Sequence, residues 1–320
     1  MLAIGSLTSD RQQAGSYRCR FDEGRMMRIL LFCCVALLTA CQSPGVLPPP
    51  APIAPEGREH PQLGQIVELA SGERLTPEQL VERLARAPRL LVGEQHDNPD
   101  HHALQLWLLR ELAARRAQGS LMLEMLTPGQ QERVAQVQAQ SRAGNAPRDL
   151  IGALAWQPGW DWSLYGPLVS EVLRQPYPLL AANLERSELM AIYQQRPTLP
   201  SGMATTPAVQ DALFADIRES HCGLLPESQL PAMLAVQQQR DRRMAERLLA
   251  APQSAVLLAG ALHARKDLGV PLHLADLGAG QGNAVLVLAE VGKEVAPGSA
   301  DYVWYTAAMP AQDHCAKLRR

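Results

Sequence analysis

The sequence predicts an α/β protein with a three-layer core, in which helices cover both faces of a mainly parallel sheet and a helical lobe is inserted. Two observations predict this class. Short apolar runs of strand length recur along the chain, and they are continuous rather than alternating, as expected for strands buried on both faces. Stretches with helical periodicity separate these runs, and such alternation favours a parallel sheet between helix layers.

Six apolar runs are predicted as strands. They lie at residues 89–93, 121–125, 178–182, 255–260, 284–289 and 301–306. Two stretches, 102–116 and 231–250, have the composition and spacing of helices. Between residues 127 and 230, only the run at 178–182 interrupts mainly helical sequence, so we expect the helical lobe at about 127–230.

The front of the chain is organised like a bacterial lipoprotein signal peptide. Residues 27–41 read MRILLFCCVALLTAC, in which an Arg precedes an apolar run too short to span a bilayer as a helix. The run ends in Leu38-Thr39-Ala40-Cys41, which resembles the lipobox motif, whose cysteine thiol accepts lipid before cleavage. We therefore assign residues 1–40 to upstream sequence and the signal peptide, and predict lipidation of Cys41.

A proline-rich stretch follows the predicted lipidation site. Residues 41–60 cannot form a ladder of backbone hydrogen bonds, so we expect an extended, lipidated tether that lifts the domain off the membrane. Because the residue after Cys41 is Gln42 rather than Asp, we expect no inner-membrane retention and predict attachment to the outer membrane, facing the periplasm. Residues 61–320 remain for the folded α/β domain.

Charge and cysteine positions add two constraints. The formal net charge is −2 and no basic block occurs, which argues against a nucleic-acid partner. Of six cysteines, three precede Cys41, so only Cys222 and Cys315 remain in the folded part. In an oxidising periplasm these two predict a disulfide, and two buried thiols are the alternative.

Polar residues near strand ends form the main candidate site, because ligands collect at the carboxyl ends of parallel strands. The set consists of Glu94, His96, Glu124 and His263. A carboxylate inside an apolar run such as LMLEM is costly unless it is paired or bound. Imidazole and carboxylate groups together predict either acid–base groups or a divalent metal site for zinc, manganese or iron. For each histidine alone, core packing or capping is the simpler interpretation.

An aromatic segment is a second candidate. Residues 156–167 read WQPGWDWSLYGP and hold three of the five tryptophans, Trp160 and Trp162 among them, in a chain with 4% aromatic residues. The segment predicts either a platform for a planar ligand or the packed hub of the helical lobe, and the hub is the simpler interpretation.

A pair of arginines is a third candidate. Arg240 and Arg243 are three residues apart and therefore share a helix face. They either bind carboxylates of a ligand or lie solvated and paired with Asp241 and Glu246.

Six motifs occur in order from about residue 89 to 265: GEQHDNPDHH, LMLEM, WDWSLYGP, AANLER, QQQRDRRMA and GALHARKDLGVP. Taken together, these motifs and their order resemble the ChaN family of haem-binding bacterial lipoproteins, which is related to erythromycin esterases and the Tiki superfamily. The resemblance implies a three-layer α/β core with a helical lobe, and a role in haem or iron acquisition at the outer membrane.

The resemblance also implies a haem site. In the family's prototype, haem is held at a dimer interface with a tyrosine ligand, so we expect non-covalent haem, a homodimer and an outer-membrane haem receptor as a partner. Carried onto this chain, Tyr165 is the best placed ligand, with Tyr177 and Tyr193 as substitutes. A phenolate suits ferric haem because its hard anionic oxygen stabilises iron(III). A nearby Arg or His is expected to pair with a propionate.

The same superfamily supports an alternative function. Its esterase-like and Tiki-type members resemble this chain in two Gly-x-x-His turns and a strand Glu, which serve catalysis there. Both turns and Glu124 are intact here. A metal-dependent hydrolase that uses Glu94, His96, Glu124 and His263 is therefore the alternative to haem binding.

Overall fold

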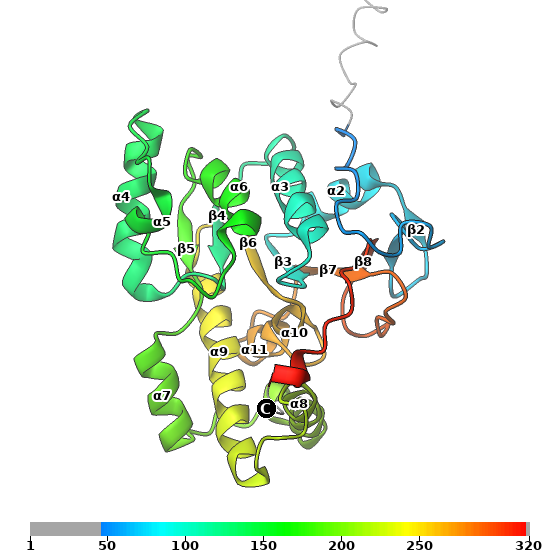
Figure 1. Ribbon diagram of the computed structural model, residues 1–320, viewed down its shortest axis with the longest axis vertical. Helices are drawn as coiled ribbons and strands as arrows, with labels where there is room; N and C mark the ends of the chain where they lie inside the picture. Colours follow the sequence, from blue (N-terminus) through cyan, green and yellow to red (C-terminus); the bar gives the residue numbers. More distant parts are fainter. Residues whose placement is uncertain (1–45, 318–320) are drawn as a thin grey trace, which may run out of the picture. The chain divides into compact units, whose positions relative to one another are not determined.

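An eight-stranded sheet in the order β2-β1-β8-β7-β3-β6-β4-β5 forms the centre of the computed structural model, which describes residues 46–317 (Figure 1). The strands from β8 to β5 are parallel, whereas β1 is antiparallel to both its neighbours. The strand bounds are β1 Ile66–Glu68, β2 Arg74–Leu75, β3 Arg89–Glu94, β4 Ser120–Leu123, β5 Leu179–Ala181, β6 Ala255–Gly260, β7 Asn283–Glu290 and β8 Tyr302–Thr306.

All six predicted strands are present in this sheet. The structure adds β1 and β2, which were not predicted because two or three residues are too few to show a hydrophobic period. The predicted signal peptide and Cys41 lie outside the described residues. Within residues 46–317, no helix is long and apolar enough to cross a membrane.

Helices cover both faces of the sheet (Figure 1). Their bounds are α2 Pro77–Ala85, α3 Pro99–Ala113, α4 Gln131–Arg142, α5 Leu150–Ala153, α6 Trp162–Val172, α7 Arg186–Gln195, α8 Pro207–Ser220, α9 Leu230–Ala250, α10 Ala261–Ala264 and α11 Val270–Asp276. Alternate strand residues pack into two cores: Leu90 and Val92 into the core with α2, α3, α4 and α6, and Leu91 into the core with α9 and α11. This confirms the predicted α/β class with a mainly parallel, doubly covered sheet.

The helices between residues 127 and 230 are divided by β5 rather than gathered in one lobe. Before β5, α6 packs beside α3 and α4 packs against β5. After β5, α7 and α8 pack on α9. The sequence could not show this division, because helical periodicity does not specify the face on which a helix packs.

From residue 46 onward, the proline-rich segment contains no helix and lies on the domain. Trp107 Nε1 donates a hydrogen bond to the Leu47 carbonyl at 2.9 Å, and Ala54 N donates to Asp100 Oδ1 at 3.2 Å. Glu56 forms a two-hydrogen-bond bridge with Ala308. The backbone thus finds partners on the domain that replace a strand ladder, so these residues do not act as a free spacer.

The disulfide between Cys222 and Cys315 is confirmed, with a Cα–Cα distance of 5.6 Å and a sequence separation of 93. Cys222 follows the end of α8, and Cys315 lies in a short 3₁₀ helix near the C-terminus. The bond therefore fastens the C-terminal segment to the helices that pack on α9.

Removing this bond should lower the free energy of unfolding. We expect the double variant Cys222→Ser, Cys315→Ser to lose about 2–4 kcal/mol, because the disulfide restricts the unfolded chain across a long loop. Urea denaturation of both proteins measures the change. The variant should be insensitive to added reductant, and equal stabilities of variant and oxidised wild type would contradict the expectation.

Candidate functional site

Two carboxylates reach opposite faces of the sheet at its carboxyl edge. Leu90 and Val92 pack into the core with α3 and α6, and Glu94, the next residue of the same parity on β3, faces the same helices. On β4, Met122 packs into the core with α9, so Glu124 faces α9. Both carboxylates are buried, which is stable only with partners.

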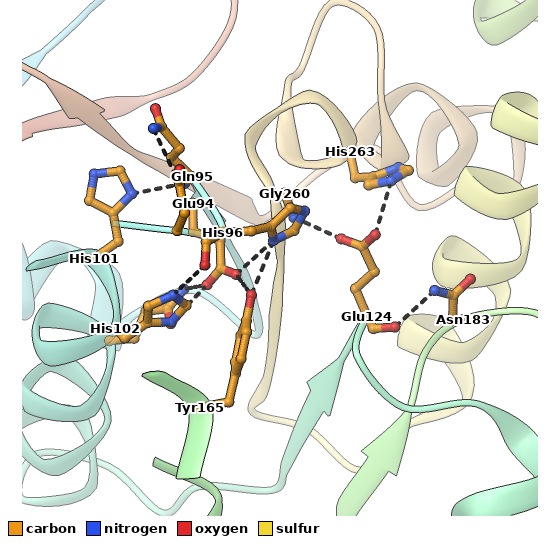
Figure 2. Close-up of polar contacts among 12 residues, drawn as sticks. Glu94, Gln95, His96, His101, His102, Glu124, Tyr165, Asn183, Gly260 and His263 are labelled. Atoms are coloured by element: carbon orange, nitrogen blue, oxygen red, sulfur yellow. Dashed lines mark hydrogen bonds and ion pairs between the residues drawn. The ribbon is translucent and has the colours of Figure 1, made fainter. Parts of the chain in front are cut away.

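Glu94 is bonded on both carboxylate oxygens (Figure 2). His96 Nδ1 lies 3.0 Å from Oε1, and the Tyr165 hydroxyl donates to the same oxygen at 2.5 Å. Gln105 donates to Oε2. Burial alone would raise the pKa of Glu94, but the hydrogen bond from His96 and the charge of His102 outweigh it and lower the pKa. Glu94 is therefore an ionised acceptor that orients His96.

Glu124 is paired with a second imidazole. His263 Nε2 lies 3.4 Å from Glu124 Oε1, and His263 Nδ1 lies 2.5 Å from the buried Asp241. Burial opposes a charged imidazole, yet the two carboxylates outweigh it and raise the pKa of His263 to about 10. Burial likewise opposes ionisation of Glu124, but the His263 charge holds its pKa below the usual range. The group is a carboxylate–imidazolium–carboxylate triad.

Gly260 brings the two carboxylate–imidazole pairs together. Parallel pairing of β3 and β6 places Gly260 opposite Glu94, and Gly260 N donates to Glu124 Oε2 at 2.8 Å. A Cβ on Gly260 would lie 2.8 Å from His96 Nε2, closer than real contacts allow. Only glycine therefore lets the His96 ring lie against this strand end and beside Glu124.

The four residues predicted at the strand ends thus converge on one site, and His96 is its accessible member. Its side chain is 41% exposed, whereas Glu94, Glu124 and His263 are buried. Burial favours the neutral ring of His96, but the hydrogen bond that His96 donates to Glu94 and the charge of Glu124 outweigh it and raise the pKa. His96 is the group through which solvent or a ligand meets the site.

The predicted arginines separate. Arg240 Nη1 lies 4.0 Å from Glu124 Oε1, and Arg240 Nε has no hydrogen-bond partner among the described residues. Arg243 instead bonds Glu188 of α7 at 3.1 Å. Asp241 is not a surface partner for either, because it is buried and bound to His263. Of the two arginines, Arg240 alone lies at the site.

The aromatic segment forms a packed hub, with one ring at the site. The Trp156 ring lies 5.1 Å from Trp162 and 5.9 Å from Tyr165, and both Trp156 and Tyr165 are core residues. The Trp160 ring is 4.9 Å from the His96 ring, edge to face. Trp160 therefore borders the site, whereas Trp162 supports the hub.

Tyr165 is not placed as an accessible haem ligand would be. It is 1% exposed, and its hydroxyl is bound to Glu94. Burial and the Glu94 charge raise its pKa and so disfavour the phenolate. Tyr177 is also buried, and burial raises its pKa to about 12. Tyr193, on α7, is half-buried and is the more accessible of the three candidate tyrosines.

Several residues that hold the site histidines in place were not predicted from the sequence. His101 and His102, interpreted as decorating a helix start, are buried: His101 Nδ1 accepts from Gln95 N at 2.8 Å, and His102 Nε2 lies 3.0 Å from the His96 carbonyl. They hold the loop that carries His96. Asp241 had a sequence signal, since it falls on the same helical stripe as the apolar face of α9.

The site does not have the ligands expected for a divalent metal. Across residues 46–317, no group of three His, Cys, Asp or Glu side chains is placed to share a metal ion. The carboxylates are instead engaged with imidazoles, a backbone N–H and side-chain donors. The chemistry that this arrangement supports is proton transfer.

Comparisons with known proteins agree with the fold and the motifs. Residues 80–274 match the family described as haem-binding uptake, Tiki superfamily, ChaN. The solved structure "Cofacial heme binding to ChaN of Campylobacter jejuni" is 29% identical with a TM-score of 0.70, and the match covers 76% of this chain and 97% of that one. A mutant of the erythromycin esterase EreC is 14% identical with a TM-score of 0.43, over 80% and 86% of the two chains, which is too distant to bear on function. No curated protein sequence matches.

The charged His263 should give stability a dependence on alkaline pH. Its folded pKa of about 10 lies above the value of about 6.5 for histidine in an unfolded chain. Its contribution to the free energy of unfolding is therefore complete below about pH 6.5 and is lost as the pH rises toward about 10. Urea denaturation across this range should show a steeper loss for wild type than for His263→Gln.

Parallel pH dependences of the two proteins would contradict this expectation. If His263→Gln does not fold, the ring protons of His263 followed by NMR in the wild-type protein give the same test, because an imidazole that titrates near its ordinary value excludes the charged triad.

Proposed function

The chain belongs to the haem-binding uptake family ChaN of the Tiki superfamily, and we propose that it binds haem as a homodimer and assists haem or iron acquisition. The observation that carries this proposal is the match to the ChaN of Campylobacter jejuni over 97% of that chain at 29% identity. That protein binds haem cofacially, and a cofacial pair of haems is most simply supplied by two copies of the chain.

We also propose that the protein is attached to the outer membrane through lipid on Cys41. The ending Leu38-Thr39-Ala40-Cys41 after a short apolar run supports lipidation of Cys41, and Gln42 favours the outer membrane over the inner one. The protein would face the periplasm, where an outer-membrane haem receptor is the expected source of its ligand.

An exposed apolar surface on helix α7 supports the proposal of haem binding. Residues 189–193 read LMAIY, yet no residue of this helix is buried, and Met190 is 48% exposed. Arg186, Met190 and Tyr193 follow a spacing of four and three residues and therefore share one helix face. An apolar porphyrin ring would lie on Met190, with the Tyr193 phenolate as a hard anionic ligand for ferric iron.

Cations at both ends of α7 suit the haem propionates. Arg186 opens the helix and Arg196 caps its end, and both are exposed. A guanidinium binds a carboxylate with two parallel hydrogen bonds. We therefore propose Tyr193, one of the two substitutes that the family resemblance left open, rather than Tyr165 as the ligand of a haem held between two protein copies.

Removing single tyrosine hydroxyls tests which tyrosine binds the haem iron. We expect Tyr193→Phe to weaken ferric haem binding by about tenfold or more, because the phenol on this face of α7 is removed, and to abolish the phenolate charge-transfer absorption. Tyr165→Phe is the matched control and should retain both, since its hydroxyl serves Glu94. Haemin titration followed by absorbance measures the two effects. The opposite pattern would assign the ligand to Tyr165.

A second candidate function rests on the buried pairs at the sheet edge, which a surface-held haem does not use. The His96 side chain is partly exposed, and Glu94 behind it can stabilise a charged ring, so His96 can take a proton from water while the hydroxide adds to an acyl carbon. The tetrahedral adduct then breaks its bond to the alcohol oxygen, and His96 gives the proton to the leaving alcohol. Arg240, with its unpartnered Nε, can stabilise the developing negative charge. We propose hydrolysis of an ester-like acyl bond as the alternative activity, driven by these side chains.

A chromogenic ester tests this alternative. We expect slow release of p-nitrophenol from p-nitrophenyl esters, reduced at least about 100-fold in His96→Ala because the general base is lost. His221→Ala, a histidine beyond the end of α8 that lies outside the site, should keep wild-type activity. Wild-type protein without turnover, or equal losses in both variants, would reject the hydrolase while leaving haem binding untouched.

A further inference from the structure

Residues 47–53 form an uncharged, apolar strip on the surface of the domain. Their sequence is LPPPAPI, and all are exposed except the half-buried Pro49. Leu47 and Ile53, at the two ends, are 62% and 54% exposed, among the most exposed large apolar side chains of residues 46–317. Such side chains are ordinary singly, but a continuous uncharged strip indicates a contact surface.

The domain holds this strip in place from both ends. Leu47 N donates to Glu111 Oε1 at 3.2 Å, and Trp107 donates to the Leu47 carbonyl at 2.9 Å. At the other end, Ala54 is fully buried and its N–H is bound by Asp100. Both ends of the strip are therefore fastened to the domain, while the side chains of Leu47 and Ile53 remain exposed.

Chain length places the strip near lipid. Leu47 is six positions after Cys41, and an extended chain advances at most about 3.6 Å per residue, or about 22 Å in all. We propose that strip 47–53 lies on the bilayer surface as a second membrane contact beside the lipid anchor. This inference rests on the lipidation of Cys41 that is part of the proposed function.

Two consequences follow from this contact. Because the strip has no charge, its affinity should not depend on anionic lipid. The strip lies beside α2 and α3, whereas α7 lies at the far end of the domain in Figure 1. A domain resting on the strip would hold α7 away from the lipid, open to haem and to a second copy of the chain.

Depth-dependent quenching tests the proposal on the full lipidated chain in phosphatidylcholine vesicles. A fluorophore sensitive to polarity is attached after Ile53→Cys, and in a matched control after Gln194→Cys on the exposed face of α7. The native cysteines of the folded part are joined in the disulfide and do not react. Nitroxide lipids should quench the label at position 53 about twofold or more beyond the control, with a blue-shifted emission.

Flotation of the vesicles distinguishes a missing lipid anchor from a strip that does not contact the membrane. Protein that does not float overturns the anchor and this proposal together, while haemin absorbance still reports haem binding independently. Protein that floats with equal quenching at positions 53 and 194 overturns the strip alone. The label at position 53 could also be shielded from water in native membranes but not in pure lipid vesicles. That result would overturn the proposal and assign the strip to a protein partner.

Discussion

The pairing of two buried carboxylates with two imidazoles at the carboxyl edge of the sheet is the interaction on which the site depends. Unpaired, Glu94 and Glu124 would oppose folding, because each must leave water. Parallel pairing of β3, β6 and β4 places Glu94 and Glu124 on opposite faces of the same sheet edge. Because Gly260 has no side chain, the His96 ring can lie against this strand end, between the two carboxylates. The loop that carries His96 is in turn held by buried histidines of α3.

Helix α9 connects this edge to the surface proposed for haem. On one turn Asp241 holds His263 and Arg240 approaches Glu124, while Arg243 bonds Glu188 on α7. The polar edge and α7 are thus distinct regions that share one support. Membership of a haem-binding family and an intact acid–base constellation are therefore compatible within one chain, since the two chemistries use different residues.

The sequence patterns predicted the strands and the convergence of residues at the strand ends, because local periodicity and strand order determine both. The six buried runs became strands, and residues at separate strand ends, such as His96 and His263, converged because parallel strands share a carboxyl edge. The sequence patterns could not predict features that depend on tertiary packing, such as short edge strands, the burial of single side chains and long-range contacts. The short β1 and β2 lack a period, Tyr165 proved to be buried in the aromatic hub, and Leu47 is bound through Trp107, a contact between residues far apart in the chain.

A haemin titration of the wild-type protein, followed by absorbance and by sedimentation, tests whether the protein binds haem as a homodimer. We expect a saturable signal of ferric phenolate haem at one haem per chain, with a mass that shifts to the dimer as haem is added, because two copies supply the cofacial pair. Absence of a saturable signal, or saturation with the monomer mass unchanged, would contradict it.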